Sequence, residues 1–326
     1  MAEPAPIPAF DVLTIGRVGI DLYPLEDGVT LDRVEVFGRY LGGSPANVAV
    51  AAARLGHSAA VITRTGTDPF ARFVHDELVR LGVRDDFVTA VEGRRTTLAF
   101  CEIFPPDNFP LYYFRDGVPP EMEIAPADLD LDCVANARVY WSSLSGLSRE
   151  PSREAHHAAW RARGRRRSTV LDLDYRPTYW ASVEEAGAEG RRALDQVDVV
   201  VGNLQECGVV VEETDPERAA NAFLSAGVDL AVIKLGPAGV FAKTRSEIAS
   251  VPSFPVDVVN GLGAGDAFGG ALCHGLLSGL GLEEMLRFAN AAGALVAGRR
   301  ECSTAMPTIT EVEDLLRRHE QGRRAR

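Results

Sequence analysis

Short apolar runs alternate with helix patterns along most of this chain, and this alternation restricts the fold more than any other feature. The run Val12–Gly16 (VLTIG) has the continuous apolar pattern of a strand buried on both faces. Helix patterns that end before a glycine, such as Ala46–Leu55 and Pro69–Leu81, separate such runs. The sequence therefore predicts an α/β fold, in which a mostly parallel sheet is covered by helices on both faces. The later buried-strand runs are AAVITRTG, ARVYWSS, TVLDLD, VDVVVG and LAVIKLG.

Two segments interrupt this alternation, at residues 28–40 and 96–115. Both alternate polar and apolar residues, are rich in aromatic and β-branched side chains, and have no helix pattern between their strands. The pattern predicts antiparallel strands, which we interpret as a small sheet that stands off the main domain as a lid. An edge hairpin on the main sheet is the alternative.

The length of 326 residues is sufficient for one large domain with a buried core. We expect a single domain over residues 10–315, with the lid strands as part of it. Residues 316–326 are polar and rich in arginine. We expect this segment to form a frayed C-terminal tail.

Charge and cysteine content narrow the classes of partner. The 34 Lys and Arg residues face 46 Asp and Glu residues, which gives a formal net charge of −12. This balance disfavours nucleic-acid and membrane-surface partners, and no apolar run has the length of a membrane span. Five cysteines without a C-x-x-C pair indicate neither a disulfide framework nor a zinc site. Because the N-terminus also has no signal-peptide pattern, we expect a cytoplasmic protein.

The most informative segment is the glycine-rich loop Asn260-Gly-Leu-Gly-Ala-Gly-Asp266, which leads into a helix pattern over Ala264–Leu280. Glycines allow a sharp turn, and the free N–H groups of a first helical turn bind anions. A carboxylate here would repel a phosphate unless it takes a proton from an incoming hydroxyl, as phosphoryl transfer to a sugar requires. The alternative is that Asp266 only caps the helix. The spacing fits neither a dinucleotide fingerprint nor a Walker A loop.

Two segments resemble the signatures of one enzyme family, the ribokinase-like (PfkB) carbohydrate kinases. Gly263–Phe268 (GAGDAF) resembles the second signature, and Gly42–Asn47 (GGSPAN) with the alanine-rich helix after it resembles the first. They occur in the family's order, and the resemblance extends from Val12 to about Pro307. It implies a Rossmann-like core with a β-sheet lid, ATP as the phosphoryl donor, and Mg²⁺.

The resemblance also implies a role for each matching residue. Asp266 corresponds to the catalytic base, and Gly263, Ala264 and Gly265 correspond to the anion hole. The implied substrate contacts include Asp21, Gly42, Gly43 and Asn47. The implied ATP contacts are Asn203, Glu206, Gly236, Gly239 and Asn290, with Glu206 also implied in holding Mg²⁺, directly or through water. Asn260 is a departure, because relatives often have there an aspartate that helps to hold a monovalent cation. A requirement for K⁺ therefore stays open.

Three features indicate a sugar acid as the acceptor. Asp172-Leu-Asp174-Tyr-Arg176 resembles the D-x-N-x-R element of sugar-acid kinases, and Arg176 would pair with a phosphate or a carboxylate. In the lid, Tyr113 and Arg115 would hold the acid or keto end of the acceptor. Together with the segments DLYP and VVNGLGAGDAF, these features resemble one branch of the carbohydrate kinase family. That resemblance implies phosphorylation of the C6 hydroxyl of 5-dehydro-2-deoxy-D-gluconate, in myo-inositol catabolism. The alternatives within the family are 2-keto-3-deoxygluconate as the acceptor, or another sugar.

Several assignments have an alternative. Arg115 is otherwise a solvated strand charge, and Arg176 is otherwise an ion pair with Asp172 or Asp174. Lys234, at the end of an apolar strand, is either a nucleotide contact or part of a buried ion pair, and we leave it out of the predicted site.

Two broader questions stay open at this stage. A sensor of sugar acids without catalytic activity is the alternative function for the whole chain, because a fold does not fix a function. The resemblance implies a homodimer through the lid as an option. The Arg161–Arg167 run is expected to be a solvated helix end and loop.

Overall fold

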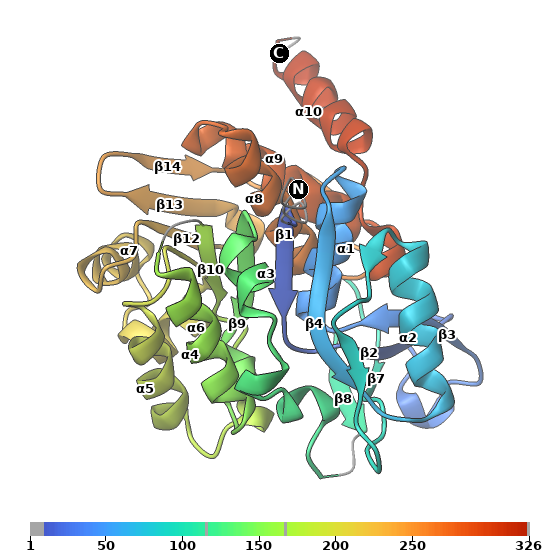
Figure 1. The fold of residues 1–326 in the computed structure, drawn as a ribbon. Helices are drawn as coiled ribbons and strands as arrows, with labels where there is room; N and C mark the ends of the chain where they lie inside the picture. Colours follow the sequence, from blue (N-terminus) through green and yellow to red (C-terminus); the bar gives the residue numbers. More distant parts are fainter. Residues whose placement is uncertain (1–9, 115–116, 166–167, 325–326) are drawn as a thin grey trace, which may run out of the picture.

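The computed structural model describes residues 10–114, 117–165 and 168–324. Its centre is a 10-stranded sheet with the order β14-β13-β12-β11-β10-β9-β1-β4-β5, in which β6 also pairs with β4 (Figure 1). All pairings from β5 to β12 are parallel, and β13 and β14 are added antiparallel. The strands are β1 Val12–Ile15, β4 Ala59–Thr65, β5 Val83–Arg84, β6 Val88–Ala90, β9 Val139–Ser143, β10 Ser168–Asp172, β11 Val199–Asn203, β12 Leu230–Lys234, β13 Val240–Thr244 and β14 Ile248–Val251.

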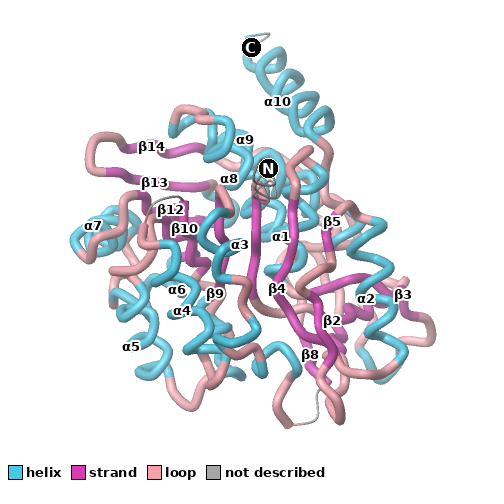
Figure 2. The backbone as a smooth tube through the Cα atoms, viewed as in Figure 1, coloured by secondary structure: helices cyan, strands magenta, loops and turns pink. Residues whose placement is uncertain are grey.

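Helices cover both faces of this sheet (Figure 2). Successive residues of a strand point to opposite faces, so Val12 packs into one core cluster while Leu13 and Ile15 pack into the other. This is why the strands read as continuous apolar runs, and the predicted α/β fold is confirmed. One cluster takes residues from α1 Ser44–Arg54, α2 Pro69–Arg80, α8 Ala264–Ser278 and α9 Leu282–Ala297; the other takes them from α3 Leu131–Asn136, α4 Ser152–Arg163, α5 Val183–Ala193, α6 Leu204–Val211 and α7 Pro216–Ser225.

A second, four-stranded sheet forms the predicted lid, so the edge-hairpin alternative is wrong. Its order is β3-β2-β7-β8, with antiparallel pairing of β2 with β3 and of β7 with β8, and parallel pairing of β2 with β7. Its strands are β2 Gly19–Pro24, β3 Phe37–Gly42, β7 Leu98–Cys101 and β8 Leu111–Phe114.

The lid differs from the prediction in one strand. The sequence analysis did not predict β2, and residues 28–36 are not a strand but a loop with a single 3-10 turn at Leu31–Arg33. The loop residues are exposed or half-buried. By contrast, β2 pairs with β3 on one side and with β7 on the other, and its side chains Ile20 and Tyr23 are buried. These tertiary contacts make the segment a strand.

The C-terminal segment is also different from the expected frayed tail, because α10 runs from Ile309 to Arg324. Leu315 and Leu316 pack against the core and anchor the helix at the point where the tail was expected to begin. On its polar side, Arg317 pairs with Asp314 one turn earlier and Glu320 pairs with Arg287 of α9 at 2.9 Å.

Of the Arg161–Arg167 run, residues 166–167 lie outside the described residues, and the described part is only partly solvated. Arg161 is exposed and pairs with Glu154 at 2.6 Å, but Arg163 is 1% exposed. Its Nε donates to Thr169 Oγ1 at 2.8 Å and its Nη1 donates to the carbonyl oxygen of Val134 at 2.7 Å. The expectation of a solvated run is therefore wrong for Arg163, whose donors satisfy buried acceptors.

Close packing of α1 on α8 brings the two sequence signatures together. A Cβ added to Gly270 of α8 would lie 2.3 Å from the Cβ of Ala51 of α1, so the glycine is needed for this approach. The start of each helix then lies near the carboxyl ends of β10, β11 and β12, where ligands bind in open α/β sheets. No helix in the described ranges is long and apolar enough to cross a membrane.

Candidate active site

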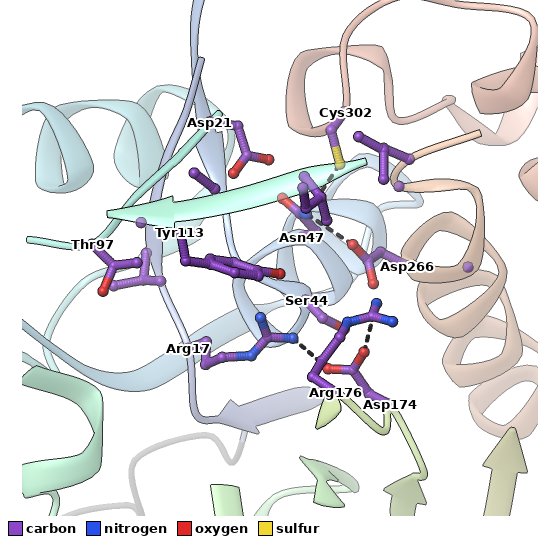
Figure 3. A pocket seen from close by; sticks show the side chains of 18 of the residues that line it. Arg17, Asp21, Ser44, Asn47, Thr97, Tyr113, Asp174, Arg176, Asp266 and Cys302 are labelled. Atoms are coloured by element: carbon purple, nitrogen blue, oxygen red, sulfur yellow. Dashed lines mark hydrogen bonds and ion pairs between the residues drawn. The ribbon is translucent and has the colours of Figure 1, made fainter. Parts of the chain in front are cut away.

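A cavity of about 220 Å³ lies between the lid, the starts of α1 and α8, and the carboxyl ends of three core strands (Figure 3). Among its lining residues are Asp21 and Tyr113 of the lid, Asn47 of α1 and Asp266 of α8. Charged side chains from the core, both acidic and basic, complete the wall. Most of the residues that were predicted to bind substrate therefore face one cavity, although they come from segments far apart in the sequence.

Asp266 lies in the first turn of α8 and contacts α1. Asn47 Nδ2 donates a hydrogen bond to Asp266 Oδ2 at 2.8 Å, and no hydrogen bond from the N–H of the N-cap residue, Gly263, to the Asp266 carboxylate occurs in the described structure. The hydrogen bonding of the described residues gives no support to a capping role for Asp266. Burial raises the pKa of Asp266 to about 6, with the Asn47 hydrogen bond opposing the shift. A carboxylate with this pKa is ionised at neutral pH and remains a competent proton acceptor.

The backbone before Asp266 supplies free donors. Gly263 has a φ of 82°, in the left-handed region that glycine tolerates, and it turns the chain into α8. The backbone N–H groups of Gly265 and Asp266 lie in the first turn of α8, where no carbonyl four residues earlier belongs to the helix. The N–H of Ala264 makes only a long contact of 3.4 Å with the carbonyl oxygen of Gly261. The predicted anion hole at Gly263, Ala264 and Gly265 therefore has the backbone geometry that it requires.

Cys302 packs against the turn at Gly263, and the sequence analysis did not identify this residue. Its thiol accepts a hydrogen bond from Asn47 Nδ2 at 3.0 Å, and a Cβ added to Gly263 would lie 2.2 Å from its Sγ. Burial raises the pKa of the Cys302 thiol well above its usual range, so the group stays protonated. Asn47 is left with a buried Oδ1 that has no hydrogen-bond partner within the described residues, and this atom is free to accept from a ligand hydroxyl.

On the lid side, Asp21 faces the cavity from β2. It accepts a hydrogen bond from Tyr23 Oη at 2.9 Å, and burial raises its pKa to about 6. A Cβ added to Gly42 would lie 2.0 Å from Asp21 Oδ1, so Gly42 makes room for the carboxylate and does not itself line the cavity. Gly43, with a φ of 96°, does line it and starts α1.

Two predicted lid contacts have different outcomes. Tyr113 of β8 lines the cavity, and its ring lies edge-on to that of Tyr179 with centroids 5.9 Å apart. Arg115 lies outside the described residues, so its predicted contact with the acid end of the acceptor stays a prediction.

The core wall carries a chain of ion pairs. Arg176 Nη2 lies 2.8 Å from Asp174 Oδ1, which matches the ion-pair alternative, while Arg176 also lines the cavity. Arg17 pairs with the other oxygen of Asp174, and Lys234 Nζ lies 3.6 Å from Asp172 Oδ1. Burial would raise the pKa of Asp174, but the two guanidinium groups outweigh this and hold its pKa below the usual range.

Lys234 belongs to the site, although it was left out of the predicted set. It lines the cavity, and a Cβ added to Gly265 would be 3.7 Å from its Nζ, so the ammonium group lies beside the start of α8. Burial lowers the pKa of Lys234, but the carboxylates of Asp172 and Glu206 outweigh burial and raise it. The group is therefore a fixed cation next to the free amides.

The residues predicted on the nucleotide side fall into two groups. Asn203 and Glu206 line the cavity and cap each other at the start of α6, through Asn203 N to Glu206 Oε2 at 2.7 Å and Glu206 N to Asn203 Oδ1 at 3.0 Å. Burial raises the pKa of Glu206 to about 7, against the effect of Lys234.

The second group is not in the cavity lining. Gly236 and Gly239 lie in the turn between β12 and β13, where a Cβ on Gly239 would be 2.0 Å from the Val251 carbonyl oxygen. Asn290 of α9 donates to the Pro252 carbonyl oxygen at 2.9 Å. The roles of these three residues in ATP binding remain predictions.

Comparison with known proteins decides the family. The family model for pfkB family carbohydrate kinases matches residues 9–309. The chain belongs to this family. This sugar kinase is 33% identical to a 5-dehydro-2-deoxygluconokinase of Bacillus subtilis (strain 168), over 94% of its own chain and 96% of that protein.

Solved structures agree with the fold of the kinase. The PfkB protein from Polaromonas sp. JS666 is similar with a TM-score of 0.81 and 27% identity, and the match covers 91% of the kinase and 98% of that chain. An uncharacterized sugar kinase from Pyrococcus horikoshii, in complex with ATP, is similar with a TM-score of 0.76 and 26% identity, covering 93% and 99%.

Among the side chains at the site of the kinase that were not predicted are Arg17, Lys234 and Cys302. Arg17 and Lys234 each stand at or just beyond the carboxyl end of a buried strand, the edge where the site was expected. That position was a usable signal in the sequence. Cys302 had no comparable signal, because its contacts with Asn47 and Gly263 depend on the tertiary fold alone.

Proposed function

We propose that this sugar kinase transfers the γ-phosphoryl group of ATP to the C6 hydroxyl of 5-dehydro-2-deoxy-D-gluconate, a reaction of myo-inositol catabolism. The observation that carries the proposal is the Asp266 carboxylate, held by Asn47 at the start of α8 in a cavity that also holds buried cations. The name of the Bacillus subtilis relative supports this choice of acceptor. Five free cysteines fit a reducing compartment, and we propose a cytoplasmic location.

In this reaction, Asp266 accepts the proton of the attacking hydroxyl. Asn47 holds the carboxylate in place and offers its own Oδ1 to a second hydroxyl of the acceptor. Asp21 accepts from another hydroxyl on the lid side. The amides at the start of α8 and the Lys234 ammonium group stabilise negative charge that develops on the phosphoryl oxygens. The lid excludes water, which would otherwise compete as acceptor.

The residues of the cavity fit a nucleotide with a divalent cation. Free helix N–H groups and a fixed ammonium group suit a polyphosphate, and the Pyrococcus horikoshii relative was solved with ATP. Within the described ranges there is no cluster of three or more acidic, His or Cys side chains that would hold a metal alone. This suits Mg²⁺, which is commonly held by one or two carboxylates together with phosphates. We assign Glu206 to it, and the ion would neutralise phosphate charge.

The Asn260 amide is engaged on both sides. Its Nδ2 donates to the Arg300 carbonyl oxygen at 2.8 Å and its Oδ1 accepts from the Leu262 N–H at 3.0 Å. The Asn260 side chain therefore stabilises the glycine-rich loop before α8, but it does not supply the full negative charge of an aspartate. The question of a K⁺ requirement, left open by the sequence, is decided by measuring turnover with and without K⁺.

A panel of acceptors tests the proposed reaction. Release of ADP would be followed with ATP and Mg²⁺ against 5-dehydro-2-deoxygluconate, 2-keto-3-deoxygluconate, fructose, ribose and adenosine. We expect kcat/KM for the first to exceed that for every other acceptor by at least about 10-fold, since an unpaired buried polar group disfavours a wrong substrate. Preference for 2-keto-3-deoxygluconate would keep the mechanism and change the acceptor. Binding of a sugar acid without turnover would favour a sensor.

We also propose a homodimer through the outer face of the lid. Phe37, Phe100 and Phe114 lie in a row there, with centroid separations of 5.3 and 5.0 Å, and Phe114 is 59% exposed. An aromatic row on an exposed sheet face is typical of an interaction surface, and a second copy offers the same row by symmetry.

The dimer predicts a specific change in mass. The purified kinase should have twice the chain mass of 35.1 kDa by light scattering, and Phe114→Ser should shift it toward the monomer. Ile248→Ser is the matched control, because Ile248 is 57% exposed on β14, outside the lid. A monomeric wild-type protein at micromolar concentration would contradict the proposal.

A further inference from the structure

Arg17 is a buried cation to which the proposed reaction assigns no role. It follows β1 and Gly16, it is 7% exposed, and it lines the cavity. Its Nη1 donates to Tyr179 Oη at 3.3 Å, and its guanidinium carbon lies 5.3 Å from the centroid of the Tyr179 ring. These contacts fix the orientation of the guanidinium group.

The direct ion pairs around Arg17 are unevenly distributed. Arg17 and Arg176 approach Asp174 from two sides, so two guanidinium groups share one carboxylate (Figure 3). The neighbouring carboxylate, Asp172, is paired with Lys234. Glu206 also acts on Lys234 and Arg176, but Asp174 is the only carboxylate within ion-pair distance of Arg17 among the described residues. Because a buried charge is costly unless it is well paired, an anionic group of a ligand would be favoured beside this guanidinium group.

One further carboxylate acts on Arg17 from the lid. Asp21 lies across the cavity and interacts electrostatically with Arg17, but its carboxylate already accepts from Tyr23 Oη at 2.9 Å. No direct ion pair between Asp21 and Arg17 occurs in the described structure. Asp21 therefore does not give the guanidinium group of Arg17 a second carboxylate in direct contact.

Hydrogen-bond donors also exceed acceptors in this corner. The Nε atoms of Arg17 and Arg176 are both buried without a hydrogen-bond partner among the described residues. Asp174 is already bonded to both guanidinium groups and to Ser145 Oγ at 3.3 Å. Buried donors without partners are uncommon in folded proteins, and a ligand carboxylate supplies both the acceptor atoms and the negative charge.

We infer that Arg17 is the specificity-determining residue for the acid group: its guanidinium binds the carboxylate of the acceptor while Asp266 receives the proton of the attacking hydroxyl. This inference rests on the proposed function, because it presumes an acid acceptor. Selection of an acid over a neutral sugar then depends on a core residue that follows β1. Asp174 and Tyr179 hold the side chain of this residue, Arg17, in place before any ligand binds, which lowers the entropic cost of binding.

The test changes the charge on both partners. We would measure kcat/KM for 5-dehydro-2-deoxygluconate and for its neutral analogue with a carboxamide at C1, in the wild type, Arg17→Gln, Arg17→Lys and Arg176→Gln. The wild type should prefer the acid by about 100-fold, as expected for loss of a buried charged hydrogen bond. The preference should fall below about 5-fold in Arg17→Gln, stay intermediate in Arg17→Lys, and largely persist in Arg176→Gln.

Each outcome has a defined meaning. A preference that survives in Arg17→Gln, or that collapses only in Arg176→Gln, overturns the inference and leaves the proposed function intact. A wild-type enzyme that phosphorylates neutral sugars and no acid overturns the proposed function itself. An unchanged Kd for ATP in each variant shows that the site is folded, and if Arg17→Gln does not fold, an undiminished preference in Arg17→Lys overturns the inference.

Discussion

Replacement of Asp266 by asparagine is expected to lower kcat by about 10³-fold, the usual contribution of a positioned general base. The amide is isosteric and still accepts from Asn47 through its oxygen, so the cavity keeps its shape. KM for the acceptor and Kd for ATP should change by less than about 3-fold. Near-normal turnover of Asp266→Asn would show that another group accepts the proton.

The same substitution should raise stability at alkaline pH. Burial raises the pKa of Asp266 from 3.8 to about 6, so the folded protein binds this proton more tightly than the unfolded chain does. The resulting stabilisation is complete below the unfolded pKa and is lost as pH rises through about 6. The variant has no such loss. Its Tm should exceed that of the wild type at pH 8, and the difference should shrink toward pH 4.

The pH dependence of turnover gives an independent readout of the base. In the wild type, kcat should rise with pH through about 6, as the Asp266 carboxylate loses its proton. Asp21 titrates in the same range because burial raises its pKa to about 6 as well. The rise belongs to Asp266 only if it disappears in the residual activity of Asp266→Asn.

Local pattern was sufficient for the six long buried strands of the main sheet, β1, β4 and β9 to β12, but not for its peripheral strands β5, β6, β13 and β14 or for the whole of the lid. Strands such as β1 and β12 are apolar on both faces, so their runs were visible without knowledge of their neighbours. The β2 segment carries Asp21 in its centre and was not recognised, because its pairing with β3 and β7 is decided by tertiary contacts. The C-terminal segment forms the helix α10 where a frayed tail was expected, and Leu315 and Leu316 of this helix pack against the core.

The residues of the site also differ in how far the sequence could predict them. Asp266 and Asn47 belong to two recognisable signatures, and their 2.8 Å contact follows from the packing of α1 on α8. Arg17 and Lys234 stand alone at strand ends, and their importance emerges only when Asp174 and Asp172 are seen as their partners. Sequence reasoning located the general base and its immediate surroundings, whereas the charge balance of the cavity required the fold.

Gly263→Ala is expected to lower kcat by about 100-fold, the cost of misplacing catalytic groups by about 1 Å. An alanine at a φ of 82° is strained, and its Cβ would lie 2.2 Å from Cys302 Sγ. The turn must therefore shift, and the amides at the start of α8 shift with it. The measurement is kcat in the wild type, Gly263→Ala, Cys302→Ala and the double variant, with Tm for each.

Two further variants distinguish the steric overlap of the alanine Cβ with Cys302 from the backbone strain of an alanine at positive φ. Cys302→Ala should restore part of the kcat lost in Gly263→Ala, because it removes the nearest atom but leaves the positive φ. Gly279→Ala, at the other end of α8, has a φ of 65° and open space for its Cβ. It should lower Tm by a similar strain while leaving kcat unchanged. Equal loss of kcat in Gly279→Ala, or no recovery in the double variant, would contradict the view that Cys302 and Gly263 together shape the anion hole.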